Sequence, residues 1–119
     1  MSGVKFLLDT NIIIGLLNRH ASVLALISEL NFCWEACAFS AITRMELLSY
    51  HSITEQEMSA IEQLLARMTY LPIDHDIEAK TIHYRRANRG KLPDAIVAAT
   101  AQVHQLTLIT LDQQLKTKV

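Results

Sequence analysis

The stretch FLLDTNIIIGLL, residues 6–17, decides the fold of this chain. The apolar run over residues 4–8 is suited to a short buried strand, and the pattern after it predicts a helix from Asp9 to about Leu17. Between strand and helix stand Asp9, Thr10 and Asn11, and an ionised carboxylate is unfavourable in a core unless it is paired or bound to a metal. We therefore expect the chain to leave the core at Asp9 or a cation to meet its carboxylate, and the two expectations are compatible.

The rest of the chain continues this alternation of short apolar runs and helical patterns. Further strands are predicted over residues 35–40, 69–73 and 106–110, and further helices over 21–30, 41–50, 54–68, 74–90 and 94–105, with a last helical turn at 112–115. Ser40 is a good N-cap for its helix, and Thr54 with Glu57 forms a capping-box pattern. Strands that alternate with helices predict an α/β fold with a parallel sheet covered on both faces.

Length and composition indicate one core-rich domain over residues 1–119. Half of the 119 residues are hydrophobic and 19% are charged, which argues against disorder. No apolar run reaches the roughly 18 residues that a membrane span requires, and the N-terminus lacks a signal-peptide pattern. We expect a cytoplasmic protein without a membrane partner.

The two cysteines, Cys33 and Cys37, predict free thiols. If the segment between them is extended, their Cα atoms lie roughly 13 Å apart, which is too far for a disulfide. We expect both to be buried, because cysteine is among the most buried residue types.

Positive charge is concentrated in one segment, although the net charge of the chain is −1. KTIHYRRANRGK, residues 80–91, places Arg85, Arg86, Arg89 and Lys91 close together. Such a cluster favours contact with RNA phosphates or is simply a solvated helix face, and the sequence leaves both interpretations open.

Four acidic residues fall at comparable places in the predicted fold. Asp9 and Asp112 follow the first and last strands, and Asp94 stands in the first turn of a helix. Glu46 lies about six residues into the helix that Ser40 caps, and its side chain leans back toward the start of that helix. Because ligands of parallel sheets bind beyond the carboxyl ends of the strands, the four carboxylates are expected at one site.

Each acid also has a plain structural interpretation. Asp9 and Asp112 can serve as N-caps, Asp94 can complement a helix dipole, and Glu46 can be solvated. Taken together these interpretations weaken, because two carboxylates ~4 Å apart at an effective dielectric of ~20 repel by about 4 kcal/mol. A divalent cation resolves this repulsion, and oxygen ligands favour Mg²⁺, or Mn²⁺ in its place, which predicts nuclease chemistry.

Other catalytic motifs are absent from the sequence. The chain has three glycines and neither a P-loop nor a G-x-G-x-x-G motif. The five histidines show no HExxH or paired spacing: His20, His51, His75, His83 and His104.

The segments FLLDTNIIIGLL, SAITRMELL, KLPDAIVAATAQVHQLTLIT and LDQQL, in this order and spacing, resemble PIN-domain ribonucleases of the small VapC toxin type. The resemblance covers essentially the whole chain. It implies a three-layer α/β/α fold with a central parallel sheet of four to five strands. It also implies a Mg²⁺-dependent endoribonuclease that hydrolyses RNA through a metal-activated water.

The resemblance carries over residue by residue to this chain. It implies catalytic and metal-binding roles for Asp9, Glu46, Asp94 and Asp112, and it matches Thr110 to the threonine of the last strand end. Asn11 matches a polar position whose amide can orient a bound water.

The resemblance further implies partners and one departure. Such toxins are typically paired with an antitoxin of a type II toxin–antitoxin module, and many form homodimers. Family members commonly continue into a further edge strand after the last acid, whereas this sequence has only a few residues beyond LDQQL.

Two other functions remain open from the sequence. The first is a catalytically inactive PIN-fold module that binds RNA or protein. The second is a phosphoacceptor receiver domain, which would place adjacent acids after the first strand and a lysine after a late strand. LLDTN and LITLD provide neither of these receiver features.

Overall fold

The structure, a computed structural model, describes residues 3–31, 33–112 and 115. Its strands are β1 (Phe6–Leu8), β2 (Cys37–Ser40), β3 (Thr69–Leu71) and β4 (Thr107–Ile109). Its helices are α1 (Thr10–Leu17), α2 (Ala21–Leu30), the 3₁₀ turn η1 (Trp34–Ala36), α3 (Ala41–Leu48), α4 (Glu55–Leu65), α5 (His75–Ala87) and α6 (Leu92–His104). The predicted order of strands and helices is confirmed.

The four described strands form one parallel sheet in the order β3-β2-β1-β4. From β1 the chain crosses to β2 and then β3 on one side, and it returns to the other side of β1 as β4. The carboxyl ends of β1 and β4 therefore mark the point where the strand order reverses, which is where open α/β sheets bind ligands.

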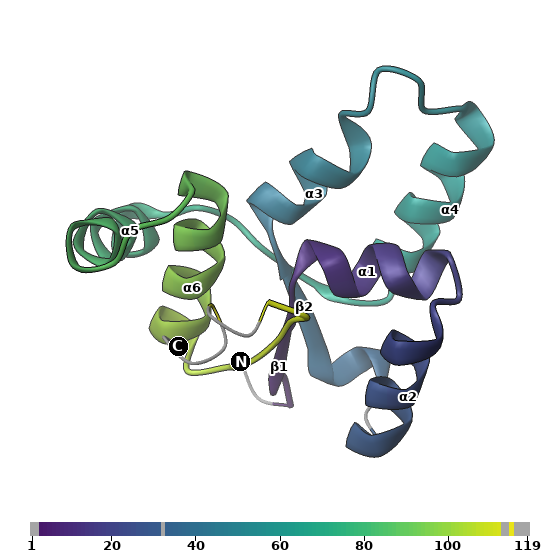
Figure 1. Cartoon of the computed structure of the whole chain (residues 1–119), viewed down its shortest axis with the longest axis horizontal. Coiled ribbons are helices and arrows are strands. Elements are labelled where there is room, and N and C mark those ends of the chain that lie inside the picture. Colours follow the sequence, from purple (N-terminus) through teal and green to yellow (C-terminus); the bar gives the residue numbers. More distant parts are fainter. Residues whose placement is uncertain (1–2, 32, 113–114, 116–119) are drawn as a thin grey trace.

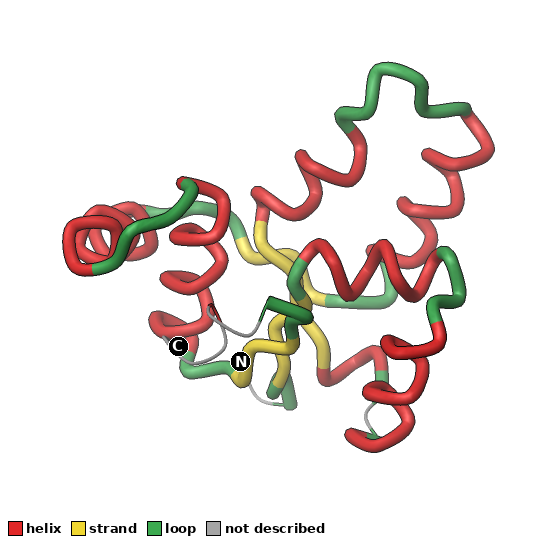
Figure 2. Tube along the Cα trace, in the orientation of Figure 1, coloured by secondary structure: helices red, strands yellow, loops and turns green. Residues whose placement is uncertain are grey.

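Helices cover both faces of the sheet and give the predicted three layers. Helices α5 and α6 lie on one side of the strands, and α1 to α4 lie on the other (Figure 1). The strands form the middle layer between these two groups (Figure 2). The α/β/α prediction is therefore confirmed, with four strands among the described residues.

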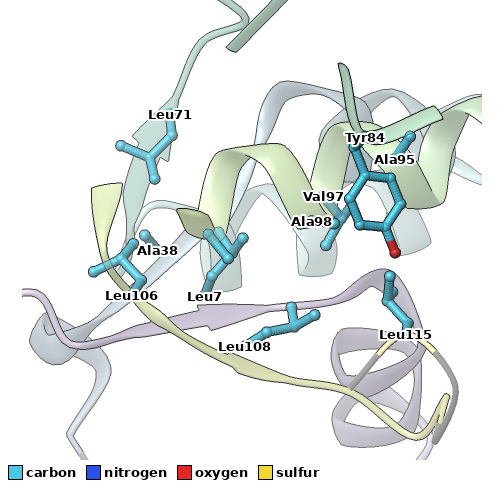
Figure 3. Close-up of a cluster of buried hydrophobic side chains, with 11 residues drawn as sticks. Leu7, Ala38, Leu71, Tyr84, Ala95, Val97, Ala98, Leu106, Leu108 and Leu115 are labelled. Atoms are coloured by element: carbon cyan, nitrogen blue, oxygen red, sulfur yellow. The ribbon is translucent and has the colours of Figure 1, made fainter. Parts of the chain in front are cut away.

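Adjacent residues of β1 serve opposite faces of the sheet, because side chains alternate along a strand. Leu7 packs in the cluster on the α6 side with Ala98 and Leu108 (Figure 3). Leu8 packs in the larger cluster on the α1 side with Ile12 and Ile61. Burial on both faces explains why the strand reads as a continuous apolar run.

The α5–α6 region differs from the predicted boundaries in a way that concerns the site. Helix α5 ends at Ala87 rather than near Gly90, because Asn88 is extended and its backbone N–H donates to the Tyr84 carbonyl. Helix α6 begins at Leu92 rather than Asp94, since Pro93 is tolerated in a first helical turn. Residues 88–91 are thus a connecting loop that carries Arg89 and Lys91.

The remaining boundaries differ by a few residues. The strand predicted from residue 35 begins at Cys37, because residues 34–36 form η1. The strand predicted to residue 73 ends at Leu71, before Pro72, which cannot donate to the ladder. The capping box of Thr54 and Glu57 is confirmed. The last turn and a further edge strand fall mostly or wholly on residues 113–114 and 116–119, outside the described residues.

The cysteine prediction is partly wrong. Both thiols are free, but Cys33 is exposed, and the segment to Cys37 is a tight turn rather than extended. Burial raises the pKa of the Cys37 thiol to about 12, and the charges of Cys33 and Glu35 add to this rise. Cys37 is therefore an unreactive core residue.

No single helix among the described residues is long and apolar enough to span a membrane. Helices α1 and α2 meet that criterion only as a pair, across a bend of 109°.

Candidate active site

Asp9 stands at the carboxyl end of β1, where the strand order reverses. Its backbone N–H donates to the Ile109 carbonyl over 3.0 Å, which continues the β1–β4 pairing by one residue. The residue that follows Ile109 is Thr110, so Asp9 and Thr110 leave the sheet side by side. Parallel pairing of two strands has thus joined residues 101 positions apart.

The Asp9 carboxylate is buried and held by two donors. It is 6% exposed, and it accepts from the Thr10 backbone N–H over 2.8 Å and from the Thr110 hydroxyl over 2.7 Å. Burial raises its pKa, the two hydrogen bonds oppose this, and the charges of Asp94 and Glu46 raise it further. Asp9 is the N-cap of α1, as one interpretation predicted, but its carboxylate also interacts electrostatically with Asp94 and Glu46.

Thr110 is the centre of a small hydrogen-bond network. Its hydroxyl oxygen accepts from Asn11 Nδ2 over 3.3 Å and from the Asp112 backbone N–H over 3.0 Å, while its proton goes to Asp9. Asn11 Oδ1 accepts from the Leu111 N–H over 3.2 Å. Asn11 therefore contacts protein groups with both ends of its amide and ties α1 to the segment that follows β4.

Glu46 is oriented by two threonines that sequence reasoning did not select. The Thr10 hydroxyl donates to Glu46 Oε1 over 2.7 Å and lies 3.1 Å from the hydroxyl of Thr43, which is fully buried. Thr43 precedes Glu46 by three residues on α3, so both lie on one helix face. That spacing, together with a threonine directly after Asp9, was the signal available in the sequence.

Asp94 is the third residue of α6, in its first turn. Its pKa is raised by burial first, then by the negative charges of Asp112 and Glu46, and Lys91 opposes the rise. Asp112 Oδ1 accepts a hydrogen bond from the Leu115 backbone N–H over 3.1 Å. Asp94 thus interacts electrostatically with all three of the other predicted acids, and Asp9 also interacts with Glu46.

Three of the four predicted basic residues reach this site. A pocket of about 80 Å³ is lined both by Arg85, Arg89 and Lys91 and by Asp94 and Asp112. Arg85 Nη2 donates to the Gly90 carbonyl over 3.2 Å, which ties α5 to the loop. Arg86 is exposed on α5 and does not line the pocket.

The donor set fits a hard divalent cation by its chemistry. All four acids offer carboxylate oxygens, and a cation would offset the mutual repulsion that raises the pKa of Asp9 and of Asp94. In residues 3–31, 33–112 and 115, no three His, Cys, Asp or Glu side chains are already arranged to hold a metal ion. The site as described is therefore a set of converging acids that binding would have to draw together.

Comparisons with known proteins agree with this fold. Residues 6–118 match the PIN domain family. A toxin–antitoxin complex from Klebsiella pneumoniae contains a chain that is 32% identical, with 92% of this chain and 88% of that chain covered and a TM-score of 0.79. No curated protein matches the sequence.

Two further solved structures share the fold at lower identity. VapBC-1 from nontypeable Haemophilus influenzae is 24% identical over 97% of this chain and 92% of that chain, with a TM-score of 0.78. VapBC2 from Rickettsia felis, bound to a DNA fragment from their promoter, is 22% identical over 96% and 92%, with a TM-score of 0.76.

The chain therefore belongs to the PIN-domain family. Within that family its likeness is to VapC-type toxins of toxin–antitoxin pairs.

Proposed function

We propose that the protein is a Mg²⁺-dependent endoribonuclease and the toxin of a type II toxin–antitoxin pair. The observation that carries this proposal is the convergence of Asp9, Glu46, Asp94 and Asp112 at the reversal point of the sheet, where burial and neighbouring acids raise the pKa of Asp9 and of Asp94. A module that only bound RNA or protein would gain nothing from this repulsion. The family membership and the basic side of the pocket support the same conclusion.

The four acids would hold Mg²⁺, with Mn²⁺ as a substitute. The ion, when bound, would supply the Lewis acidity that activates a water and offsets the charge developing on a phosphate. The chain's other residues keep the acids in place: Thr110 holds Asp9, and Thr10 holds Glu46. Asn11 fixes the Leu111–Asp112 segment, and its second amide proton remains available to orient a water.

The basic side of the pocket would hold the RNA backbone. Arg85, Arg89 and Lys91 line the same pocket as Asp94 and Asp112, so a phosphate held by these cations would lie close to Asp94. Hydrogen bonds from guanidinium groups to phosphate are strong and directional. Arg86 would add to the positive field without lining the pocket.

The proposed partners are RNA as substrate, a cognate antitoxin protein and a second copy of the chain in a homodimer. The solved structures that share this fold support the antitoxin, because they are described as toxin–antitoxin complexes. An antitoxin segment that covered the acidic site would block access of the substrate.

The direct test incubates the purified protein with total RNA in Mg²⁺ or in EDTA and maps the ends that are formed. Discrete cuts should appear in Mg²⁺ only. Asp9→Asn, Glu46→Gln and Asp94→Asn should each abolish them while the circular dichroism spectrum stays that of the parent. Asp76→Asn is the matched control, because Asp76 is an exposed acid in the first turn of α5 and lies away from the pocket.

RNA binding without any cut in Mg²⁺ or Mn²⁺ would contradict the proposal. That outcome would leave the inactive RNA-binding module as the function. Cleavage that survives all three substitutions would also contradict it, since the acids would then not be the catalytic groups.

A further inference from the structure

Tyr84 is a pocket residue that neither the sequence motifs nor the acidic site accounts for. It lies in the last turns of α5 and is 7% exposed, and it lines the pocket together with basic residues, Asp94, Asp112 and Leu115. The ring packs in the apolar cluster with Ala95, Ala98 and Leu115. Figure 3 shows the phenol oxygen at the Leu115 end of the ring, away from Val97 and Ala98.

The packing of this side chain requires only the ring. Phenylalanine would fill the same apolar space, and the hydroxyl has no hydrogen-bond partner among the described residues. The hydroxyl of a buried tyrosine usually has a hydrogen-bond partner in the protein or is exposed to solvent. The polar end of Tyr84 therefore lies at the pocket, and no group among the described residues uses its donor.

The hydroxyl keeps its proton near neutral pH. Burial raises the pKa of Tyr84, and the charges of Asp94 and Asp112 raise it further. A phenol in this state is a hydrogen-bond donor. The group that it meets in the pocket must therefore offer an acceptor oxygen.

The charges around the pocket select the acceptor. Arg85, Arg89 and Lys91 give the side next to α5 three positive charges, which attract an anion. The volume of about 80 Å³ exceeds the ~30 Å³ share of one water in the liquid, so the pocket admits a small group such as a phosphate. We propose that the Tyr84 hydroxyl is a substrate-binding group that donates a hydrogen bond to a phosphate oxygen of the bound strand, on the α5 side of the acids.

This inference rests on the proposed function for the identity of the strand, but it is tested without catalysis. The measurement is equilibrium binding of a fluorescent single-stranded RNA and of the DNA of the same sequence, in EDTA, over a range of salt concentrations. Tyr84→Phe should weaken binding of both strands by roughly ten- to hundredfold, because one hydrogen bond to a charged group is lost. The thermal midpoint should stay that of the parent, since the ring is retained.

Two matched variants separate a hydrogen bond from other effects. Tyr70→Phe removes a hydroxyl from an exposed tyrosine on β3, outside this pocket, and should leave binding unchanged. Arg89→Gln should lower the slope of log affinity against log salt, whereas Tyr84→Phe should shift the line without changing its slope, because an uncharged donor releases no counterions.

Each outcome bears on the proposal. Unchanged binding by Tyr84→Phe would overturn it, and so would a loss confined to RNA, which would identify a ribose 2′-hydroxyl as the acceptor. A parent protein that cuts RNA while Tyr84→Phe binds normally would overturn only this inference. If the parent protein binds RNA in a Tyr84-dependent way but does not cleave it, this inference is supported and the proposed nuclease function is rejected.

Discussion

The Thr110 hydroxyl donates a 2.7 Å hydrogen bond to the Asp9 carboxylate and so joins the ends of β1 and β4. The same oxygen accepts from Asn11 and from the Asp112 backbone. One side chain thus sets the relative positions of the first and last acids of the site.

Replacing Thr110 by valine tests this network. Thr110 is 4% exposed, so valine keeps the shape but leaves Asp9 with one donor fewer and two N–H groups without an acceptor. We expect the free energy of unfolding to fall by about 1–3 kcal/mol. The pKa of Asp9 should rise further, because the Thr110 hydrogen bond lowers it.

Urea unfolding and NMR titration of the carboxyl carbons measure the two effects. Thr107→Val, at an exposed position of β4, is the control and should change neither quantity. Equal stabilities of the Thr110 and Thr107 variants would contradict the role of Thr110.

Asp94→Asn should stabilise the metal-free protein at neutral pH. A carboxyl whose pKa is higher in the folded state than its ordinary value of 3.8 binds its proton more readily when folded, so its ionisation lowers stability. That penalty is complete above the folded pKa and vanishes below 3.8. The thermal midpoint of Asp94→Asn in EDTA should therefore exceed that of the parent at pH 7, and the gap should close as the pH falls toward 4.

The opposite sign would identify Asp94 as a structural hydrogen-bonding group. Added Mg²⁺ gives a second check, because it should stabilise the parent more than the variant if Asp94 helps to hold the ion.

Gly15→Ala should destabilise the protein, although alanine normally favours a helix over glycine. A Cβ atom at Gly15 would lie 2.4 Å from Val23 Cγ2, so α1 and α2 could not keep their present approach. Overpacking of this kind costs about 1–3 kcal/mol. Gly15→Ala/Val23→Ala removes the 2.4 Å contact and leaves only the Cβ of residue 23, at 2.9 Å, so urea unfolding should show positive coupling between the two positions. Additive losses would mean that the close approach is not what requires glycine.

Two neighbouring arginines should differ in their effect on RNA binding. Arg89 lines the pocket beside Asp94, whereas Arg86 does not. Arg89→Gln should weaken binding of a single-stranded RNA in EDTA and lower its salt dependence by more than Arg86→Gln does. If the slope of log affinity against log salt concentration were the same for the parent and both variants, the basic segment would be a solvated helix face that does not contact RNA.

The sequence predicts the architecture well because its apolar runs are short, continuous and separated by helical patterns. The sequence predicts one site for Asp9, Glu46, Asp94 and Asp112, since the carboxyl ends of parallel strands share one edge, and the catalytic roles of these acids stay a prediction. The sequence predicts a break at residues 91–93, but not that α5 already ends at Ala87, because that end depends on Asn88 adopting an extended conformation where the basic pattern still looks helical. The contacts of Thr10 and Thr43 join distant segments, and the sequence shows only that Thr10 follows Asp9 and that Thr43 stands three residues before Glu46.

The most direct test of the central claim is the chemistry of the RNA ends. A ribonuclease that uses the 2′-hydroxyl of its substrate generally needs an acid and a base on opposite sides of the phosphate, and paired histidines are the usual choice near neutral pH. The acidic site described above instead favours attack by water. Cleavage in Mg²⁺ should therefore leave a 5′-phosphate and a 3′-hydroxyl, stop in EDTA, and tolerate a 2′-methoxy group beside the cut when binding is retained. Cyclic 2′,3′-phosphate ends that form equally well in EDTA would contradict the account and the catalytic roles of Asp9, Glu46, Asp94 and Asp112.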